Sequence, residues 1–224
     1  MKIPLSTRLR ACKEFVAPGH RVADIGCDHG YLGISLLKEN IASFVIASDI
    51  REKPLESAIR NAERFGVQEK MSFHLSDGAQ NIPREFDTLV CAGMGGDTMV
   101  SILDDAPWLQ NQKYQLILQC QTRVHTLRRY LSSHGWKIDQ EVLVRDGRFL
   151  YTVMKVCFAQ GGILAPAQCY FPPALLDNPK DVLEDYYQFV LQGLINTGKH
   201  QDNSQELNEL YQIGKELGFS YDNG

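Results

Sequence analysis

The spacing of hydrophobic and polar positions alternates along the chain between the periods typical of strands and of helices. Short apolar runs predict buried strands at residues 21–26, 43–50, 71–78, 86–96 and 114–120. Apolar side chains at helical spacing predict helices at residues 3–16, 31–38, 55–66 and 123–134. An antiparallel hairpin that turns at Asp146-Gly147 is predicted from residues 136–145 and 149–158. This order predicts an α/β fold: a mostly parallel, Rossmann-like sheet with helices on both faces and the hairpin at one edge.

A second, smaller unit is predicted after the sheet. Residues 159–174 are rich in Gly and Pro, which is typical of a linker. Beyond it, residues 179–197 and 202–218 predict two antiparallel, coiled-coil-like helices. Their apolar positions at heptad-like spacing are Val182, Tyr186, Phe189, Val190, Gly193, Leu207, Leu210, Tyr211 and Leu217. We therefore expect a Rossmann-like domain over 1–160 and a C-terminal helical hairpin over 161–224.

Composition and charge narrow the classes of function. The contents of 44% hydrophobic and 22% charged residues are ordinary for a globular protein. No apolar run approaches the roughly 18–20 residues that cross a bilayer, and the first residues lack the apolar segment of a secretory signal. We expect a cytoplasmic protein with no membrane partner.

The net charge of −4 is unevenly distributed along the chain. Residues 175–224 hold 3 Lys against 9 Asp or Glu, a net charge of −6, which leaves +2 for residues 1–174. If the protein acts on a nucleic acid, its contacts with phosphates are therefore expected from the first 174 residues.

The six cysteines are scattered, without a C-x-x-C pair and without the Cys/His spacing of a zinc site. We interpret them as reduced thiols that pack as small hydrophobes, and we expect no metal. The sequence does not determine the oligomeric state, for which a monomer is the simplest expectation.

The candidate ligand-binding residues lie at the carboxyl ends of the predicted strands, where ligands bind in doubly wound sheets. The first such loop contains Asp24, Gly26, Cys27, Asp28, His29 and Gly30. Its glycines let the backbone approach a ligand closely, whereas its two carboxylates would repel a pyrophosphate. The spacing also differs from that of G-x-G-x-x-G. A ligand with sulfonium and ammonium groups fits these charges, and S-adenosylmethionine is such a ligand. The alternative is an ordinary turn of an α/β protein.

Acidic residues also follow the next two strands. Asp49, with Ile50 beside it, ends the second strand 23 residues after Gly26, where an acid accepts hydrogen bonds from ribose hydroxyls. The alternative is a cap for the following helix. Asp77 and Gly78 end the third strand, where a carboxylate can accept from the exocyclic amine of adenine. The alternative there is a plain turn.

The fourth strand ends in Gly93-Met94-Gly95-Gly96-Asp97. Its glycines leave room for the methionyl part of a cofactor and for an acceptor, and Met94 is a candidate wall of that pocket. The alternative is a flexible loop that enters a helix capped by Asp97. The Asn/Asp-Pro-Pro-Tyr motif of exocyclic-amine methylases is absent, which argues against direct chemistry on N6.

Several motifs occur in an order that resembles one known family. They are R-L near the N-terminus, V-A-D-I-G-x-D-H-x-Y-L, the acid after strand two, D-G after strand three, A-G-M-G-G, L-I-L-Q, and L-R-x-x-L followed by E-V-L-V. Together they resemble the bacterial tRNA (adenine-22, N1)-methyltransferase family over about residues 5–158. D-I-G-x-D-H combined with G-M-G-G is far more specific than any single motif. The family's C-terminal coiled-coil-like extension agrees with the helices predicted over 179–218.

The resemblance implies a tRNA substrate, S-adenosylmethionine as cofactor and specific site residues. The residues it implies for the cofactor pocket are Asp24, Gly26, Asp28, His29, Asp49, Asp77, Gly78, Gly93, Met94 and Gly95, to which we add the neighbouring Cys27 and Ile50. The family's catalytic carboxylate falls on Asp28. Two departures exist: Gln119-Cys120-Gln121 stands where L-Q-P is expected, and Gly30 stands where Ala is frequent. The first weakens the assignment of a role for strand five toward the target base.

Adenine N1 lies on the Watson–Crick edge, so the target nucleotide must be unpaired and turned into the pocket. We expect Asp28 to stabilise the ring charge that methylation creates, or to receive the N6 proton. His29 and Tyr31 are candidates to stack on the base or hydrogen-bond it, although a helix cap is the alternative for His29. Arg8, Arg10 and Lys13 form the expected phosphate-binding face, with a merely solvated face as the alternative.

Two other functions fit the same residues. One is an enzyme of this fold with another acceptor, such as a small molecule, a protein or a different RNA. The other is a non-catalytic RNA- or protein-binding module that docks through its helical tail. Glycine loops and three acids at strand ends favour an active cofactor site, because a pure binding module gains little from them.

Overall fold

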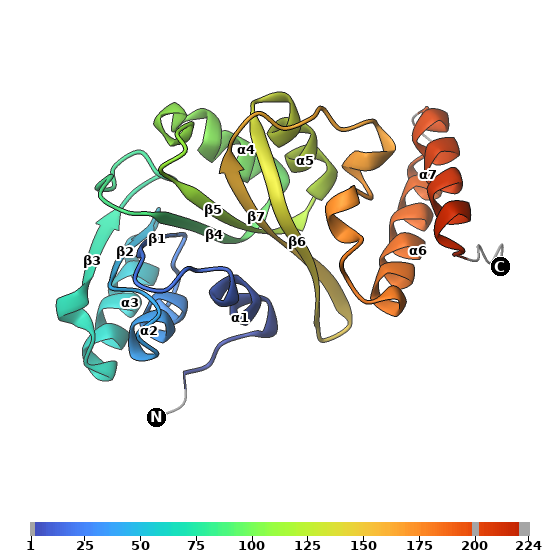
Figure 1. The fold of residues 1–224 in the computed structure, drawn as a ribbon. Helices are drawn as coiled ribbons and strands as arrows, with labels where there is room; N and C mark the ends of the chain where they lie inside the picture. Colours follow the sequence, from blue (N-terminus) through green and yellow to red (C-terminus); the bar gives the residue numbers. More distant parts are fainter. Residues whose placement is uncertain (1–2, 199–201, 220–224) are drawn as a thin grey trace.

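A seven-stranded sheet forms the centre of the molecule (Figure 1). A computed structural model describes residues 3–198 and 202–219. The strands are β1 (Arg21–Ile25), β2 (Phe44–Asp49), β3 (Met71–Leu75), β4 (Thr88–Gly95), β5 (Gln115–Thr122), β6 (Trp136–Asp146) and β7 (Phe149–Phe158). Their spatial order is β3-β2-β1-β4-β5-β7-β6. The first five pair in parallel and β7 runs antiparallel to both neighbours, which confirms the predicted sheet with its edge hairpin. The strand order reverses between β1 and β4, the switch point of such a sheet.

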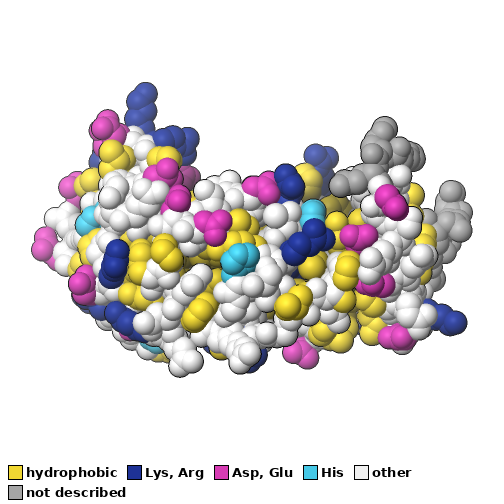
Figure 2. All heavy atoms as spheres, turned by 90° about the horizontal axis from the view of Figure 1, so that it is seen from above, with side chains coloured by type: hydrophobic (Ala, Val, Ile, Leu, Met, Phe, Trp, Pro, Cys, Tyr) yellow, Lys and Arg dark blue, Asp and Glu magenta, His cyan; other side chains and the backbone are white. Residues whose placement is uncertain are grey.

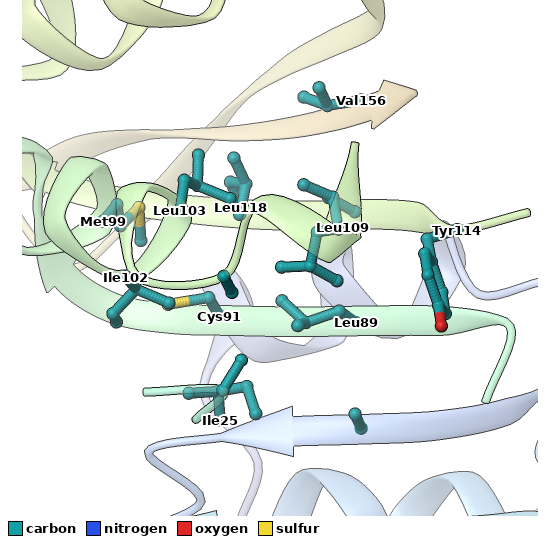
Figure 3. Close-up of a cluster of buried hydrophobic side chains, with 14 of the residues drawn as sticks. Ile25, Leu89, Cys91, Met99, Ile102, Leu103, Leu109, Tyr114, Leu118 and Val156 are labelled. Carbon is teal, nitrogen blue, oxygen red and sulfur yellow. The ribbon is translucent and has the colours of Figure 1, made fainter. Parts of the chain in front are cut away.

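Helices cover both faces of the sheet. On one face lie α1 (Thr7–Glu14), α2 (Tyr31–Lys38) and α3 (Glu52–Phe65), and on the other lie α4 (Gly96–Asp104) and α5 (Val124–Ser133) (Figure 1). Each face has its own apolar core, and Figure 3 shows the one under α4, where Met99 and Leu103 pack above Leu89 and Cys91 of the sheet. Burial of these side chains provides the main stabilisation of the fold.

Local signals set most element ends. The side chain of Ser6 accepts a hydrogen bond from the Leu9 N–H and caps α1, and Gly66 ends α3 at φ +66°. The predicted third strand, 71–78, ends earlier, at Leu75. There the Ser76 hydroxyl donates to the Gly78 carbonyl and accepts from the Asn81 N–H, which turns the chain.

Two helices, α6 (Lys180–Thr197) and α7 (Ser204–Leu217), lie side by side at one end of the molecule (Figure 1). They share a separate core with the short helical turns η3 (Ala167–Cys169) and η4 (Pro173–Leu175). The predicted apolar face of α6 is wrong in part, because Phe189 and Gly193 are exposed whereas Leu183 and Leu191 are buried. The helix packs against the preceding segment as well as against α7, which a two-helix pattern does not anticipate.

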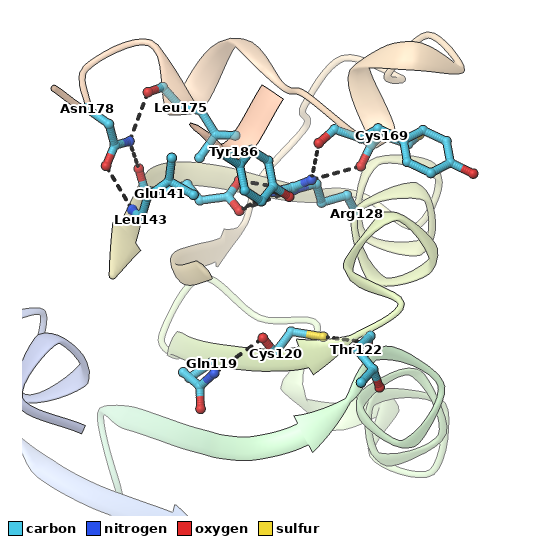
Figure 4. A network of polar contacts seen from close by, with 11 residues as sticks. Gln119, Cys120, Thr122, Arg128, Glu141, Leu143, Cys169, Leu175, Asn178 and Tyr186 are labelled. Carbon is cyan, nitrogen blue, oxygen red and sulfur yellow. Dashed lines mark hydrogen bonds and ion pairs between the residues drawn. The ribbon is translucent and has the colours of Figure 1, made fainter. Parts of the chain in front are cut away.

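A buried polar network joins these helices to the sheet (Figure 4). The Arg128 guanidinium of α5 is fully buried and donates to the Glu141 carboxylate of β6 at 2.6 Å and to the Tyr186 hydroxyl of α6 at 3.1 Å. It also donates to the carbonyls of Cys169 and Tyr170, at 3.0 and 2.8 Å. All donor nitrogens of the guanidinium are therefore used, and the C-terminal segment is held against β6 and α5.

Candidate cofactor site

A cavity of about 520 Å³ opens at the carboxyl ends of β1, β2 and β4, bordered by the loop after β3. With the exception of Gly95, every residue predicted to bind the cofactor or to act in catalysis lines it. These residues are Asp24, Gly26, Cys27, Asp28, His29, Tyr31, Asp49, Ile50, Asp77, Gly78, Gly93 and Met94. Four loops that are far apart in the sequence meet here because parallel strands bring their carboxyl ends to one edge.

The carboxylate of Asp24 lies at the floor of this cavity, where it is only 4% exposed. Within the described residues, its Oδ2 atom has no hydrogen-bond partner. Burial raises the pKa of Asp24 to about 7; the Gly33 N–H lowers it, and the nearby Asp49 raises it further. A buried, unpaired carboxylate is costly, so this group is suited to a cationic ligand that completes its contacts.

Asp49 is also buried and holds the first loop in place. Its Oδ2 accepts from the Asp28 N–H at 3.2 Å, and its Oδ1 accepts from the Arg51 N–H at 3.0 Å. The alternative function as a helix cap is wrong, because the N-cap residue of α3 is Arg51 and no side chain caps that helix. Asp49 thus links the loop after β1 to the loop after β2.

Asp28, His29 and Tyr31 form the rim of the cavity. The Asp28 and His29 side chains are more than half exposed, with Oδ2 of Asp28 3.7 Å from Nε2 of His29. The His29 and Tyr31 rings lie 5.8 Å apart. A cap by His29 is not seen, since the N-cap of α2 is Gly30 and no side chain caps that helix. An acceptor that enters from solvent would meet these three side chains first.

Close packing between loops explains two of the glycines. At Gly26, which has φ +69°, an added Cβ would lie 2.3 Å from Cε of Met94. The loop after β1 therefore touches the end of β4 at this point. At Gly95, an added Cβ would lie 2.9 Å from Oγ1 of Thr122, and Gly95 does not line the cavity. The prediction that Gly95 contacts the cofactor is corrected: this glycine lets β4 pack against the end of β5.

Asp97, expected as a possible cap of the following helix, has a different partner. The N-cap of α4 is Gly95, without a side-chain cap, and Oδ2 of Asp97 lies 2.9 Å from Nη1 of Arg123. Gln119 and Ser76 shape the site but were not among the predicted residues. Gln119 is fully buried beneath the cavity residue Gly93 and accepts from the Gly93 N–H at 3.0 Å, and Ser76 shapes the loop that contains Asp77. The L-I-L-Q motif was the available signal for Gln119, but it does not reveal the distant partner.

The predicted basic face of α1 does not form as one surface. Lys13 is ion-paired with Glu39 at 2.6 Å, and its side chain is mostly buried. The Arg10 guanidinium donates to the Leu5 carbonyl at 2.8 Å. Arg8 alone of the three lines the cavity, with its guanidinium 5.7 Å from the centre of the Tyr151 ring. Lys13 is therefore corrected to a structural ion pair, and Arg8 is the cation of α1 that reaches the cavity.

Cysteines and potential metal ligands are dispersed over residues 3–198 and 202–219. No group of three or more His, Cys, Asp or Glu residues in these ranges is arranged to hold a metal ion. None of the six cysteines forms a disulfide, and all but Cys157 are buried. Among the same residues, no helix has the length and apolar character required to span a membrane.

Comparison with known proteins assigns the chain to a family. The family described as "Methyltransferase domain" matches residues 5–154. The chain belongs to this family. It is 32% identical over 154 residues to the tRNA (adenine(22)-N(1))-methyltransferase of Bacillus subtilis (strain 168), and the alignment covers 68% of this chain and 65% of that protein. The chain thus spans just under two thirds of the length of that curated relative.

Two solved structures agree with the fold over nearly the whole chain. The B. subtilis M1A22 tRNA methyltransferase TrmK is 28% identical with a TM-score of 0.79, covering 97% of this chain and 98% of that one. A Streptococcus pneumoniae protein in complex with S-adenosyl-L-methionine is 28% identical with a TM-score of 0.81, covering 95% of this chain and 99% of that one. The methyltransferase fold expected from the motifs is confirmed.

Proposed function

We propose that this protein transfers the methyl group of S-adenosylmethionine to N1 of the adenine at position 22 of tRNA. The observation that carries the cofactor assignment is the buried carboxylate of Asp24, whose Oδ2 atom has no hydrogen-bond partner among the described residues, in a 520 Å³ cavity at the switch point. The similarity to a structure that contains S-adenosyl-L-methionine supports it. The similarity to a tRNA (adenine(22)-N(1))-methyltransferase supports the choice of acceptor.

The residues present fit the cofactor. Asp24 would pair with its cationic methionyl end, a contact that its Oδ2 atom lacks within the described residues. Asp49 would accept from the ribose hydroxyls, and Asp77 from the adenine amine beside the exposed Ile50. The backbone of Gly93, without a Cβ atom, leaves space for close approach. When bound, S-adenosylmethionine supplies an electrophilic methyl group, and no metal is needed.

The protein's own contribution to the reaction is positioning and electrostatics. The target adenine must leave its stack to bring N1 to the cavity. His29 and Tyr31 on the rim would support the ring, and Arg8 would hold an adjoining phosphate. Asp28, exposed beside them, would stabilise the positive charge that the ring acquires, or accept the proton that leaves N6. The charge of Asp28 is therefore needed in the transition state more than in the ground state.

We also propose that the molecule divides at residue 160 into a catalytic domain and a coiled-coil-like helical extension over 161–224. The separate apolar core of α6 and α7 supports this division. A cytoplasmic location and a monomeric state complete the proposal, in keeping with a tRNA substrate.

The Asp28→Asn variant tests the catalytic role. Asn keeps the size of Asp and tolerates the left-handed backbone at this position, where φ is +50°. We expect kcat for tRNA methylation to fall about 100-fold, with the dissociation constant for S-adenosylmethionine within about threefold of the wild-type value. The measurement is transfer of labelled methyl to a tRNA transcript followed by nucleoside analysis, with Asp105→Asn as an exposed control.

Near-normal turnover of Asp28→Asn would remove this residue from the mechanism. Assays of the wild-type protein distinguish the proposed function from the two alternatives, an enzyme with another acceptor and a non-catalytic binding module. If it binds the cofactor but does not methylate tRNA, the acceptor is another molecule. If calorimetry detects no cofactor binding, the protein is a non-catalytic module.

Cofactor binding is expected to depend on pH through Asp24. The folded-state pKa of this carboxyl is raised to about 7 by burial, so the cofactor-free protein holds it protonated below that pH. A cationic ligand binds the ionised form, so binding below pH 7 must release this proton. We expect the dissociation constant to rise about tenfold per pH unit below 7 and to level off above it. Calorimetry between pH 5.5 and 8 measures this, and a constant affinity over the range would contradict it.

A further inference from the structure

A groove of about 810 Å³, separate from the cofactor cavity, lies beside that cavity. Its walls come from the end of β5 and the start of α5, from the β6–β7 hairpin, and from α6. It therefore spans the boundary between the sheet and the C-terminal helices. On the face shown in Figure 2, Lys or Arg side chains gather with His at that boundary, beside exposed hydrophobic side chains.

The groove is locally cationic in a chain whose net charge is −4. Among its lining residues, four are arginines and one, Asp185, is acidic. Arg145 pairs with Asp185, and Arg128 is neutralised by Glu141. Arg148 is exposed and forms no ion pair within the described residues, and Arg123 keeps a largely exposed side chain although it contacts Asp97. The surplus charge of the groove is therefore positive.

His125 lines the same groove, and the nearby arginines contribute to lowering its pKa. Burial lowers the pKa of His125 most, and Arg129, Arg123 and Arg128 lower it further, against a small opposing effect of Asp97. The ring stacks on Tyr170 at 4.5 Å. A neutral imidazole stacked on a phenol gives this wall a flat, uncharged surface between arginines.

Aromatic side chains are exposed along the same groove. Phe149 is 53% exposed and Phe189 is 69% exposed, which is unusual for side chains of this size. The Arg148 guanidinium lies 4.9 Å from the centre of the Phe149 ring, and Tyr151 lies 6.1 Å from the same ring. Cations alternating with exposed aromatic rings are typical of surfaces that bind single-stranded nucleic acid, because phosphates pair with the cations and bases stack on the rings.

The groove adjoins the cofactor cavity at two points. Arg8 lines the cavity, and its guanidinium lies 5.7 Å from the ring centre of Tyr151, which lines the groove. At the second point, a Cβ added to Gly93 in the cavity would lie 3.7 Å from Nε2 of Gln121 in the groove. An RNA strand that occupies the groove would thus lead to the cavity that Asp28 and Tyr31 also line.

We propose that this groove binds the segment of substrate RNA next to the target nucleotide, with Arg148 and Arg123 on its phosphates and Phe149 and Tyr151 stacked on its bases. The inference rests on the proposed function, which requires an adenine held outside its helix. An unpaired base must have its neighbours held, and the groove supplies both the cations and the rings for that. It also gives α6 a role, since Phe189 forms part of the wall.

The test compares Arg148→Glu and Phe149→Ala with the wild-type protein, using a full-length tRNA transcript. Arg64→Glu, at an exposed position on α3, is the matched charge control. We expect Arg148→Glu to weaken tRNA binding about tenfold at 0.1 M salt and to reduce the salt slope by about 1. Phe149→Ala is expected to weaken binding about fivefold or more, as the loss of one stacked base would. Both should raise KM for tRNA while the affinity for S-adenosylmethionine stays unchanged.

The outcomes separate the two proposals. If the wild-type protein methylates tRNA but both variants keep the KM and salt slope of Arg64→Glu, the groove is not an RNA site, although the proposed function stands. If the wild-type protein binds S-adenosylmethionine but neither binds nor methylates tRNA, the proposed function fails and the groove assignment fails with it. Thermal melting of each variant shows whether a loss of binding reflects a loss of folding.

Discussion

Replacement of Asp24 with Asn is expected to abolish measurable cofactor binding and to stabilise the cofactor-free protein. The carboxylate is buried with one oxygen unpaired among the described residues, and burial raises its pKa to about 7. In the unfolded chain it ionises near the ordinary value of 3.8. A raised pKa means that the stability present below pH 3.8 is lost as the pH rises through 7. At pH 8 the wild-type protein therefore bears the full cost of a buried, unpaired charge.

Asparagine removes that charge but also the partner for a cationic ligand. We expect the affinity for S-adenosylmethionine to fall at least about 100-fold, since a charge-assisted contact in a buried site is lost. The free energy of unfolding at pH 8 should rise by about 1–3 kcal/mol, with the gain disappearing toward pH 4. Calorimetry and urea unfolding at both pH values measure these effects, with Asp105→Asn as the control. A variant that binds the cofactor normally would contradict the assignment of Asp24.

Replacement of Arg128 with Met is expected to cause a large loss of stability. The guanidinium joins α5, β6, α6 and the segment at Cys169 and Tyr170 within a fully buried network (Figure 4). Its removal leaves Glu141 as a buried, uncompensated charge and leaves two carbonyls without this donor. Breaking a buried pair in this way costs about 3–5 kcal/mol.

The neighbouring residue provides a matched control for this experiment. Arg129 lies on the same helix but is exposed, so Arg129→Met should change the free energy of unfolding by less than about 0.5 kcal/mol. The double variant Arg128→Met/Glu141→Leu is expected to recover part of the loss, because no charge is then left unpaired. Urea unfolding measures stability, and hydrogen exchange in α6 shows whether the C-terminal helices loosen. Equal urea midpoints for Arg128→Met and Arg129→Met would contradict the role of the network.

Much of the candidate site was predictable because each strand end carries its own local signal. Asp24, Asp49 and Asp77 each follow a short apolar run, and glycines interrupt the same loops. The parallel sheet then brings these ends to one edge, so predicting the element order was enough to predict the cavity. Gly95 shows where this reasoning fails. A glycine in such a loop can serve a ligand or a neighbouring strand, and only its distance to Thr122 distinguishes the two.

Charged residues were harder to assign for the same reason. Arg8, Arg10 and Lys13 share a helix in the sequence, yet Lys13 is held by Glu39 and only Arg8 of these three reaches the cavity. The periodicity of α6 was similarly incomplete, since Leu183 and Leu191 are buried while Phe189 is not. The pairing of Lys13 and the burial pattern of α6 cannot be read from the sequence of either helix, because both depend on the surface that packs against the helix.

By itself, the amino-acid sequence determined the order of strands and helices, the hairpin at the sheet edge and the acids at the strand ends. These properties depend on the period of apolar side chains and on turn residues, which act over a few positions. The tertiary structure alone decided that Oδ2 of Asp24 is buried without a hydrogen-bond partner among the described residues, and that a cationic, aromatic groove adjoins the cavity. It also decided that Arg128 connects the C-terminal helices to the sheet. Burial and charge pairing depend on segments that lie far apart in sequence and meet only when the chain packs.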